Sequence, residues 1–478
     1  MNRARAIIFY FIIWVIGFSV IFFSSCKVER SEGIIIFTQF SANLQRESPA
    51  DRDSSLQEIR ARIVSIDQNL ADRQPVLLTD EFYSARSPEI SIDGKKMLFT
   101  ARKNQGDKWQ IWEINLKNLK SRLVTSFKDN CIDPAYLPNG RIIFSKLTPD
   151  SDSNGANAIY SCNADGSDIK QSTFNPDAYR ALTVLQDGRL MAISRQLDSD
   201  EMEEAFMVLR PDGTKNELFY EGEDGSSLES RMRETGDGKL IFIESDEQDP
   251  DHGNVISLNY KDPFHSYKNI TSGLEGDFKS VYPMKSGKYL VSYRKSSAER
   301  YGLYEFDPEN KSLGKAISSS QDFDAAEIVA FEHNEQPRKL PSEVDMGVKT
   351  GLILCQDINF HGFQPSGEVS DMSKASKIRI IGRDSVLGEV DVENDGSFYL
   401  KVIADTPFRL ETVDDKGHAV GEICDWIYLR PNERRGCVGC HESQEVVPEN
   451  KVSLAVKHAP VSIPVHINKV VEKKVSLE

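Results

Sequence analysis

Two cysteines and a histidine near the C-terminus, in the run Cys437-Val438-Gly439-Cys440-His441, are the residues best suited to carry chemistry. Their C-x-x-C-H spacing is the one that attaches a c-type haem. Two thiols three positions apart can each form a thioether with one porphyrin vinyl group, and the next residue, His441, is then held under the iron as an axial ligand. The sequence therefore predicts one covalent haem c on Cys437, Cys440 and His441.

A C-x-x-C pair can also serve redox catalysis or bind zinc. Redox pairs usually open a helix in a βαβ unit, and structural zinc needs a second pair of Cys or His ligands. Neither context is evident around residues 437–441. Covalent haem is the favoured interpretation, and it requires export, because this haem is attached outside the cytoplasm.

The second ligand of the iron decides what the haem does. A vacant face favours small-molecule chemistry, whereas a His or Met ligand favours electron transfer. The candidates for this ligand, each of which has an ordinary surface position as its alternative, are His458, His466, His361 and, as a weaker choice, Met372. The adjacent Arg434 and Arg435 are candidates for pairing with the haem propionates, since guanidinium groups match carboxylates; a solvated basic turn is the alternative.

Residues 1–25 have the features of a secretory signal. Arg3 and Arg5 precede an apolar run over 6–23, which ends in Ser24-Ser25-Cys26. A cysteine after two small residues resembles a bacterial lipobox, so we expect lipid on Cys26 and a tether over 26–32. An uncleaved membrane anchor is the alternative. Either outcome predicts a membrane-tethered protein of the bacterial cell envelope, facing the periplasm or the surface.

Charge and cysteine content exclude other classes of function. Removal of Arg3 and Arg5 with the signal takes the net charge from −16 to −18, which argues against binding to nucleic acid or to anionic lipid. The four remaining cysteines are too few for a disulfide framework, although one or two bridges fit an oxidising compartment. They are Cys131, Cys162, Cys355 and Cys424, and the first two, which lie in one repeat, are the favoured pair.

Residues 33–335 contain a repeat marked by a glycine turn before an apolar strand. The turn glycines Gly94, Gly140, Gly188, Gly238 and Gly287 are 46, 48, 50 and 49 residues apart. Four strands in about fifty residues is the pattern of a propeller blade, and five such blades fit between 83 and 320. Strands at 33–80 and one at 322–335 would together form a sixth blade that closes the ring and removes open sheet edges.

Other polar and aromatic residues of the array have simpler explanations than ligand binding. Acidic loops such as 150–154 and 246–251 lack calcium-loop spacing and are expected to be solvated hairpin loops. Trp109 and Trp112 are expected in the core of a blade rather than in a ligand platform.

A second, smaller domain follows the linker at 336–349. Short alternating strands over 350–412, with a turn at Asn394-Asp395-Gly396, predict an immunoglobulin-like sandwich over 350–430. A last aromatic strand at 425–430 would form a wall of the haem pocket or part of the sandwich core. The haem segment then occupies 431–450 and a tail 451–478. The expected fold is all-β: a six-bladed propeller, a small β domain and a short haem-binding segment.

Two family resemblances add to this interpretation. The run Ser87-Pro88-Glu89-Ile90-Ser91-Ile92-Asp93-Gly94-Lys95 resembles the blade motif of TolB-type, WD40-like propellers. The order of domains, with Trp426-Ile427-Tyr428-Leu429-Arg430-Pro431 leading into Glu433-Arg434-Arg435-Gly436-Cys437, resembles the hydrazine synthase alpha subunit family. In that family the corresponding haem is the proposed site where nitrogen compounds are joined.

Two departures limit what the resemblance implies. The synthase is described as using a tyrosine four residues past the motif histidine as iron ligand, and this sequence has Glu445 there. The synthase also carries a second haem domain, whereas 37 residues follow His441. The resemblance therefore implies the architecture and the haem attachment, but not hydrazine synthesis.

Two functions of different class remain. The first is a membrane-tethered monohaem protein, an electron carrier or an oxidoreductase, whose propeller docks a redox partner protein or whose haem meets a small nitrogen or oxygen compound. The second is a propeller module that binds a protein or polymer, with a structural or sensory haem. The sequence leaves the oligomeric state, the substrate and the partner open.

Overall fold

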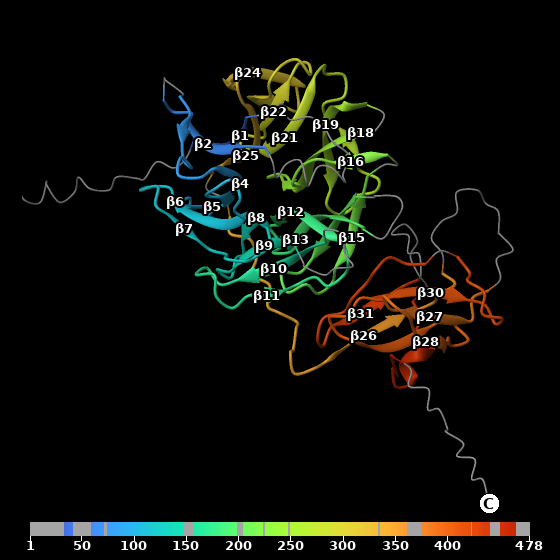
Figure 1. Ribbon diagram of the computed structural model, residues 1–478. Helices are drawn as coiled ribbons and strands as arrows, with labels where there is room; N and C mark the ends of the chain where they lie inside the picture. The colour runs from blue at the N-terminus through green and yellow to red at the C-terminus, as the bar shows by residue number, and fades with distance from the viewer. Residues whose placement is uncertain are drawn as a thin grey trace, which may run out of the picture.

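The computed structural model describes residues 33–41, 59–70, 74–147, 156–197, 204–222, 225–246, 249–332, 335–360, 374–421, 423–439 and 450–464. Their strands form six propeller blades and a smaller β domain at one side of the ring (Figure 1). The all-β fold with six blades that the glycine spacing predicts is therefore confirmed.

The blades are antiparallel sheets that follow one another along the chain. The ring-closing blade 1 consists of β25 (Asp324–Ala330), β1 (Ile34–Phe40), β2 (Ala61–Asp67) and β3 (Val76–Leu77). Blade 2 consists of β4 (Ser84–Ile90), β5 (Lys96–Arg102), β6 (Gln110–Asn115) and β7 (Ser121–Leu123). Blade 3 consists of β8 (Cys131–Tyr136), β9 (Ile142–Leu147), β10 (Asn157–Cys162) and β11 (Lys170–Gln171).

The other three blades follow the same plan. Blade 4 consists of β12 (Ala178–Val184), β13 (Leu190–Arg195), β14 (Glu204–Leu209) and β15 (Glu217–Glu221). Blade 5 consists of β16 (Ser226–Leu228), β17 (Arg233–Glu234), β18 (Lys239–Asp246), β19 (Asp249–Asn259) and β20 (Lys268–Asn269), and its first strand is split, since β16 and β17 both pair with β18. Blade 6 consists of β21 (Asp277–Pro283), β22 (Tyr289–Arg294), β23 (Gly302–Asp307) and β24 (Ser312–Ser318).

The repeated glycines hold the turn between the first and second strands of their blades. Gly140 and Gly188 have φ of 84° and 88°, a region that favours glycine, and each donates its N–H to the carbonyl three residues earlier at 2.9 Å. Because these turns are local, their sequence pattern is sufficient to predict them.

The two ends of the repeat array lie in one sheet, as the ring-closure prediction requires. β1 pairs antiparallel with β25, from Ile35 opposite Ala330 to Phe40 opposite Asp324, and its other edge pairs with β2. Blade 1 is thus built from segments nearly 300 residues apart in sequence, so both ends of the array are needed to complete it.

Bulges in the first strands connect neighbouring blades. Ser87, Asp133 and Glu327 have φ between 52° and 54° at such bulges. The Glu327 carboxylate accepts the backbone N–H of Ser87 at 2.7 Å, and Asp133 accepts the Ser87 hydroxyl at 2.9 Å and the N–H of Ala181 at 2.7 Å. Backbone N–H groups that the bulges free from the sheet are therefore satisfied by a carboxylate of the preceding blade.

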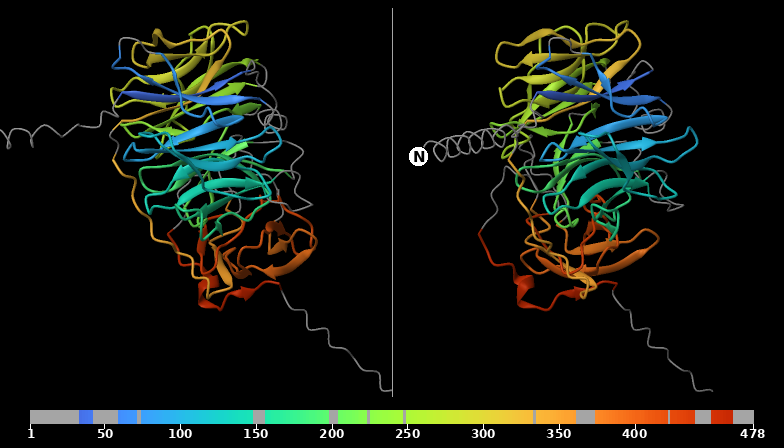
Figure 2. Two further views of the ribbon diagram at one scale, coloured as in Figure 1. Left: turned by 60° about the vertical axis from the view of Figure 1, so that its left-hand side comes forward. Right: turned by 90° about the vertical axis from the view of Figure 1, so that its left-hand side faces the viewer.

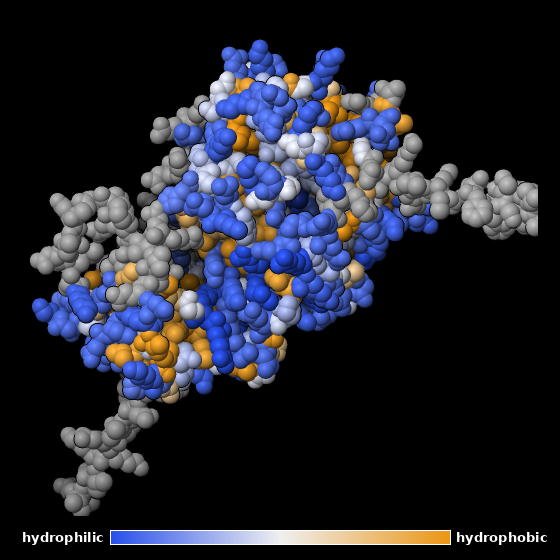
Figure 3. Space-filling model, turned by 180° about the vertical axis from the view of Figure 1, so that it is seen from behind, coloured by the Kyte–Doolittle hydropathy of each residue, from blue (hydrophilic) through white to orange (hydrophobic). Residues whose placement is uncertain are grey.

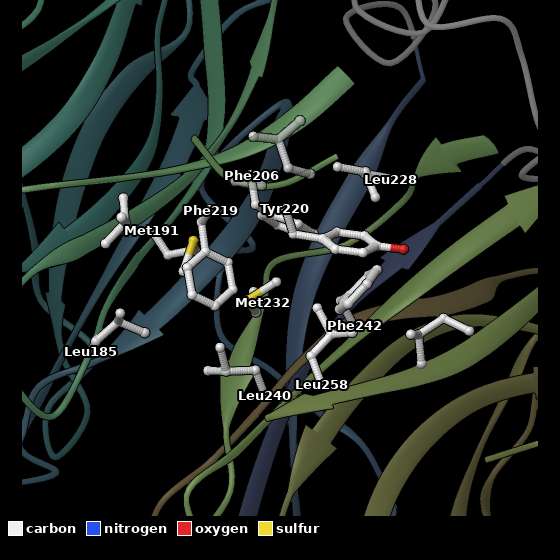
Figure 4. Packing of buried hydrophobic residues seen from close by; sticks show 14 residues of the cluster. Leu185, Met191, Phe206, Phe219, Tyr220, Leu228, Met232, Leu240, Phe242 and Leu258 are labelled. Carbon is white, nitrogen blue, oxygen red and sulfur yellow. The ribbon is translucent and has the colours of Figure 1, made fainter. Parts of the chain in front are cut away.

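Apolar side chains fill the space between blades. Phe206 and Tyr220 of blade 4 pack against Phe242 of blade 5, with ring centroids 5.0 and 5.7 Å from it (Figure 4). The next residue of β18, Ile243, faces the core shared with blade 6. Successive strand residues alternate between two cores, so both faces of β18 are buried.

The β domain is a sandwich of two sheets, as predicted. One sheet contains β31 (Arg434–Cys437), β26 (Thr350–Cys355), β29 (Phe398–Ile403) and β32 (Val461–Ser462), and the other contains β28 (Val386–Asp391), β27 (Lys377–Ile381) and β30 (Arg409–Val413). Ile353 and Leu400 of the first sheet share a core with Ile378 and Leu410 of the second. The sequence did not predict β31, β32 or the short 3₁₀ helix η1 (Leu454–Lys457).

The predicted linker runs along the propeller to the β domain (Figure 2). The N–H of Arg338 donates to the Gln186 carbonyl at 3.0 Å, and that of Glu343 donates to the Asp212 carboxylate at 2.7 Å. A hydrophilic surface covers most of the propeller face seen from behind (Figure 3), as a net charge of −16 leads us to expect.

Candidate functional site

The segment that leads into the C-x-x-C-H motif lies between the β domain and blade 4. The buried Tyr428 donates its hydroxyl hydrogen to the Gly213 carbonyl at 2.8 Å and packs edge-on against Phe174, with centroids 5.7 Å apart. The next residue, Leu429, belongs to the core of the β domain. The strand predicted at 425–430 is wrong, because the segment makes only an isolated bridge, between Ile427 and Phe408, within the described residues.

Arg430 connects the same segment to the propeller. Its Nε donates to the Asp212 carbonyl at 3.0 Å, its guanidinium pairs with the Asp405 carboxylate at 2.7 Å, and it stacks over Phe174 at 4.7 Å. Burial raises the pKa of Asp405 even though Arg430 acts in the opposite direction. With a side chain 8% exposed, Arg430 is a structural contact between domains.

Glu433 is the most completely buried charge of the segment, with a side chain 0% exposed. It accepts the N–H of Lys215 in blade 4 at 2.9 Å and the N–H of Arg430 at 2.7 Å. It also accepts Nε and Nη2 of Arg435 at 3.2 and 2.8 Å. A single carboxylate therefore joins the propeller, the approach to the motif and the start of β31.

β31 carries the first motif cysteine into the sandwich. It pairs parallel with β26, with Ile353 opposite Arg435 and Cys355 opposite Cys437. The Gln356 N–H then donates to the Cys437 carbonyl at 3.0 Å, and the Asp357 N–H to the Val438 carbonyl at 3.2 Å. The pairing fixes the backbone through Val438.

The part of the motif that the structure describes, residues 437–439, fits haem attachment. Cys437 is half-buried at the end of β31, so its sulfur is held in place but remains reachable. Gly439 lies so close to the Phe360 carbonyl that a Cβ there would clash, which explains a glycine between the two cysteines. Cys440 and His441 lie outside the described residues, as do His361, Met372, Glu445 and His466.

The two predicted propionate partners differ in their surroundings. The Arg435 guanidinium is 11% exposed and already paired with Glu433. Arg434 lies on the opposite face of β31 from Arg435 and is exposed, next to Lys401 and Asn432 in a small surface pocket. Of the two, Arg434 is thus the one whose charge faces solvent.

His458, the predicted second iron ligand, follows η1 on the other edge of the sheet from β31. Its side chain is 69% exposed, with Nε2 3.7 Å from a Glu393 carboxylate oxygen. Asp395 and Ser397 hold η1 by accepting the N–H groups of Leu454 and Ala455 at 2.8 and 3.0 Å.

The favoured disulfide between Cys131 and Cys162 is not formed, and both thiols are buried in the core between blades 2 and 3. Their strands flank β9, where Cys131 pairs with Lys146 and Cys162 with Ile142. Four residues along a strand is roughly 13 Å, too far for a disulfide. Burial instead raises the pKa of Cys131 to about 12 and that of Cys162 to about 11.

A cavity of about 460 Å³ lies where blades 3 and 4, the linker and the β domain meet. Its lining includes Phe174, Arg210, Asp212, Met346, Asp405 and Arg430. These residues are adjacent only because three distant segments meet, so no local sequence signal marks them. The predicted signal and Cys26 lie outside the described residues, and none of the helices within the described ranges is long and apolar enough to cross a membrane.

Comparisons with known proteins agree with this architecture. Residues 356–442 match the family model described as hydrazine synthase alpha subunit middle domain. Hydrazine synthase subunit alpha from Kuenenia stuttgartiensis is 24% identical over 550 aligned residues, which cover 87% of this chain and 67% of that protein. This chain is similar to the hydrazine synthase alpha subunit.

One solved structure gives the same fold for this hydrazine synthase alpha-like chain. Kuenenia stuttgartiensis hydrazine synthase matches with a TM-score of 0.75 and 21% identity, covering 89% of this chain and 71% of that one. TolB from Acinetobacter baumannii matches with a TM-score of 0.40 and 17% identity, covering 62% and 66%. The resemblance that the domain order and the run leading into the motif predict is confirmed, and the family match includes the whole C-x-x-C-H motif.

Proposed function

We propose that this hydrazine synthase alpha-like chain is an exported, membrane-tethered c-type haem protein that acts in electron transfer or haem-based redox chemistry. The observation that carries the proposal is the position of Cys437 at the end of a strand fixed by β26 and, through Glu433, by blade 4. A reactive centre attached there has a defined position relative to the propeller, which serves as the docking scaffold for a redox partner.

The residues have separate roles in this proposal. Cys437 and Cys440 would hold the haem through two thioethers, and His441 would be a nitrogen ligand of its iron. The bound haem supplies a one-electron redox centre whose potential depends on its ligands and its exposure to water. Glu433 and Arg430 keep β31 in place, and Arg434 offers an exposed guanidinium to a propionate.

The experiment is expression of the full chain with a haem-attachment system, followed by haem staining on a denaturing gel. We expect a stained wild-type band and loss of the stain when Cys437 and Cys440 are both replaced by Ala. Cys424→Ala, a change at a cysteine outside the motif, should keep it. An unstained wild-type band refutes the redox function and leaves the propeller as a binding module.

The absorption spectrum separates the two redox roles. His441→Ala should keep the stain but change the spectrum, because the thioethers remain while an axial ligand is lost. High-spin iron in the wild type that binds nitric oxide or hydroxylamine supports catalysis, and low-spin iron of defined potential supports electron transfer. If His458 is the second ligand, His458→Ala converts low-spin iron to high-spin; an unchanged spectrum excludes it.

Tethering is tested separately. In cells grown with a palmitate analogue, the wild-type chain should carry the label and the Cys26→Ala chain should not. The reason is that the lipobox-like ending places the lipid on that cysteine. Equal labelling of both contradicts a lipid anchor at Cys26, and a wild type without label favours an uncleaved membrane anchor.

A further inference from the structure

A third cysteine lies beside the first haem-attaching one. Cys355 and Cys437 are register partners on the parallel strands β26 and β31. Neighbouring strands are roughly 4.8 Å apart, within the ~4.4–6.8 Å between Cα atoms that a disulfide spans. Cys355 belongs to the sandwich core and is 1% exposed, and Cys437 packs against the same core, so both side chains lie on one face of the sheet.

We propose that Cys355 and Cys437 form a reversible disulfide in the haem-free protein, and that its reduction releases Cys437 for haem attachment. The disulfide itself depends only on the fold, whereas its consequence for haem rests on the proposed function. The hydrogen bonds from Gln356 and Asp357 to the backbone after Cys437 keep the two residues in register whether or not they are bridged.

The exchange needs an oxidant with a disulfide, such as a thiol oxidase of the cell envelope. The half-exposed Cys437 thiolate attacks that disulfide, forms a mixed disulfide and releases one thiol of the oxidant. The Cys355 thiolate then attacks the Cys437 sulfur and releases the second thiol. The two cysteines lose two electrons and two protons, and the oxidant gains them; a dithiol reductant reverses both steps.

The bridge would prevent haem attachment at Cys437, the first cysteine of the motif. A Cys437 sulfur bonded to Cys355 has no S–H to add across a vinyl group, so the thioether cannot form until the bridge is reduced. Because Cys355 is buried, the bridge would be formed and opened through the more exposed Cys437.

Cys424 provides a matched control inside the same domain. It packs against the same core, but on the side of β30, where its sulfur accepts the Leu410 N–H at 2.9 Å. Burial raises the pKa of its thiol to about 11. A core-packed cysteine away from β31 should not join the exchange.

The test uses the haem-free chain without residues 1–26, purified under reducing conditions and then incubated with oxidised glutathione. Remaining thiols are blocked with N-ethylmaleimide, and tryptic peptides are separated without reductant. We expect a linked pair of peptides, 350–374 with 436–451, that separates on reduction. Cys440→Ser should keep this pair, and Cys355→Ser and Cys437→Ser should each abolish it, while Cys424→Ser should leave it unchanged.

Two results would overturn the inference: a bridge between Cys437 and Cys440 in the wild type, or Cys355 recovered fully alkylated. Haem staining of Cys355→Ser, which keeps both attaching thiols, separates this inference from the proposed function. A stained Cys355→Ser without a linked pair in the wild type refutes the disulfide alone. A linked pair with no stain in the wild type refutes the haem function and retains the disulfide.

Discussion

Glu433→Gln is expected to destabilise the junction between the β domain and the propeller. The carboxylate, 0% exposed, receives hydrogen bonds from the N–H groups of Lys215 and Arg430 and from two nitrogens of Arg435. Glutamine has the same shape but no charge, and it keeps one acceptor oxygen. The Arg435 guanidinium, 11% exposed, would then be buried without its counter-ion.

The expected loss is about 3 kcal/mol in the free energy of unfolding. Removing one partner of a buried ion pair costs about 3–5 kcal/mol, and the amide oxygen of glutamine offsets part of this by keeping one hydrogen bond, worth about 1 kcal/mol. Replacing Glu433 and Arg435 together by Met should cost less than Glu433→Gln, because no charge is left buried.

Urea unfolding of the mature chain, followed by circular dichroism, measures this loss. Glu389→Gln is the matched control: Glu389 lies in the same domain and pairs with Arg379 at 3.1 Å, but its side chain is 32% exposed, so about 1 kcal/mol or less is expected. Alkylation of Cys437 should also become faster in Glu433→Gln, since Arg435 and Cys437 share β31. Equal losses for the two Gln variants would refute the reasoning.

Three further predictions concern the propeller and its junction. Tyr428→Phe leaves the Gly213 carbonyl without its buried donor and should cost about 1–3 kcal/mol in urea unfolding; no loss would contradict the contact. Deleting 33–78 removes most of blade 1 and should give aggregating protein by gel filtration; a monomer with unchanged Tm would contradict ring closure. Burial alone would raise the pKa of Asp133, but Arg231 and the Ala181 N–H hold it below the ordinary 3.8, so its contribution to stability is present above about pH 4 and lost below it. Asp133→Asn should therefore flatten the acid side of the stability–pH profile, and an unchanged profile would count against these half-buried contacts of Asp133.

The sequence predicts the parts of this fold whose signals are local. Turns such as the one at Gly140 need a positive φ that an Asn-Gly pair supplies, and the flanking apolar strands alternate between two cores. Ring closure also follows, because a blade missing one strand and a lone strand remain at the ends of the array. In the sandwich, the positive φ of Gly396 supplies the same local signal and predicts the hairpin there.

Non-local pairing explains what the sequence does not predict. The run Arg434–Cys437 is a strand because it pairs with β26, about 80 residues earlier, and its own polar residues indicate a solvated turn. Residues 425–430 alternate like a strand, with Tyr428 against blade 4 and Leu429 in the sandwich core, but they pair with a neighbour only at the isolated bridge between Ile427 and Phe408. The partner of Glu433 in the propeller is 218 residues away, and no spacing rule connects positions so distant.

The same long-range contacts give the C-x-x-C-H motif its structural context. A pentapeptide on a solvated tail would let an attached group move freely, whereas here Cys437 ends a strand whose position depends on Glu433 and on the Tyr428 contact with Gly213. A partner bound to the propeller would therefore meet the motif at a fixed distance, and distances of this kind control the rate at which an electron or a small substrate passes between proteins. If the junction serves this purpose, a variant that loosens it without touching the motif, such as Tyr428→Phe, should keep the haem stain and slow reduction by a protein partner, while small-molecule reduction by dithionite should proceed at the wild-type rate. Equal slowing of both reactions would place the effect on the haem itself and contradict a docking role for the propeller.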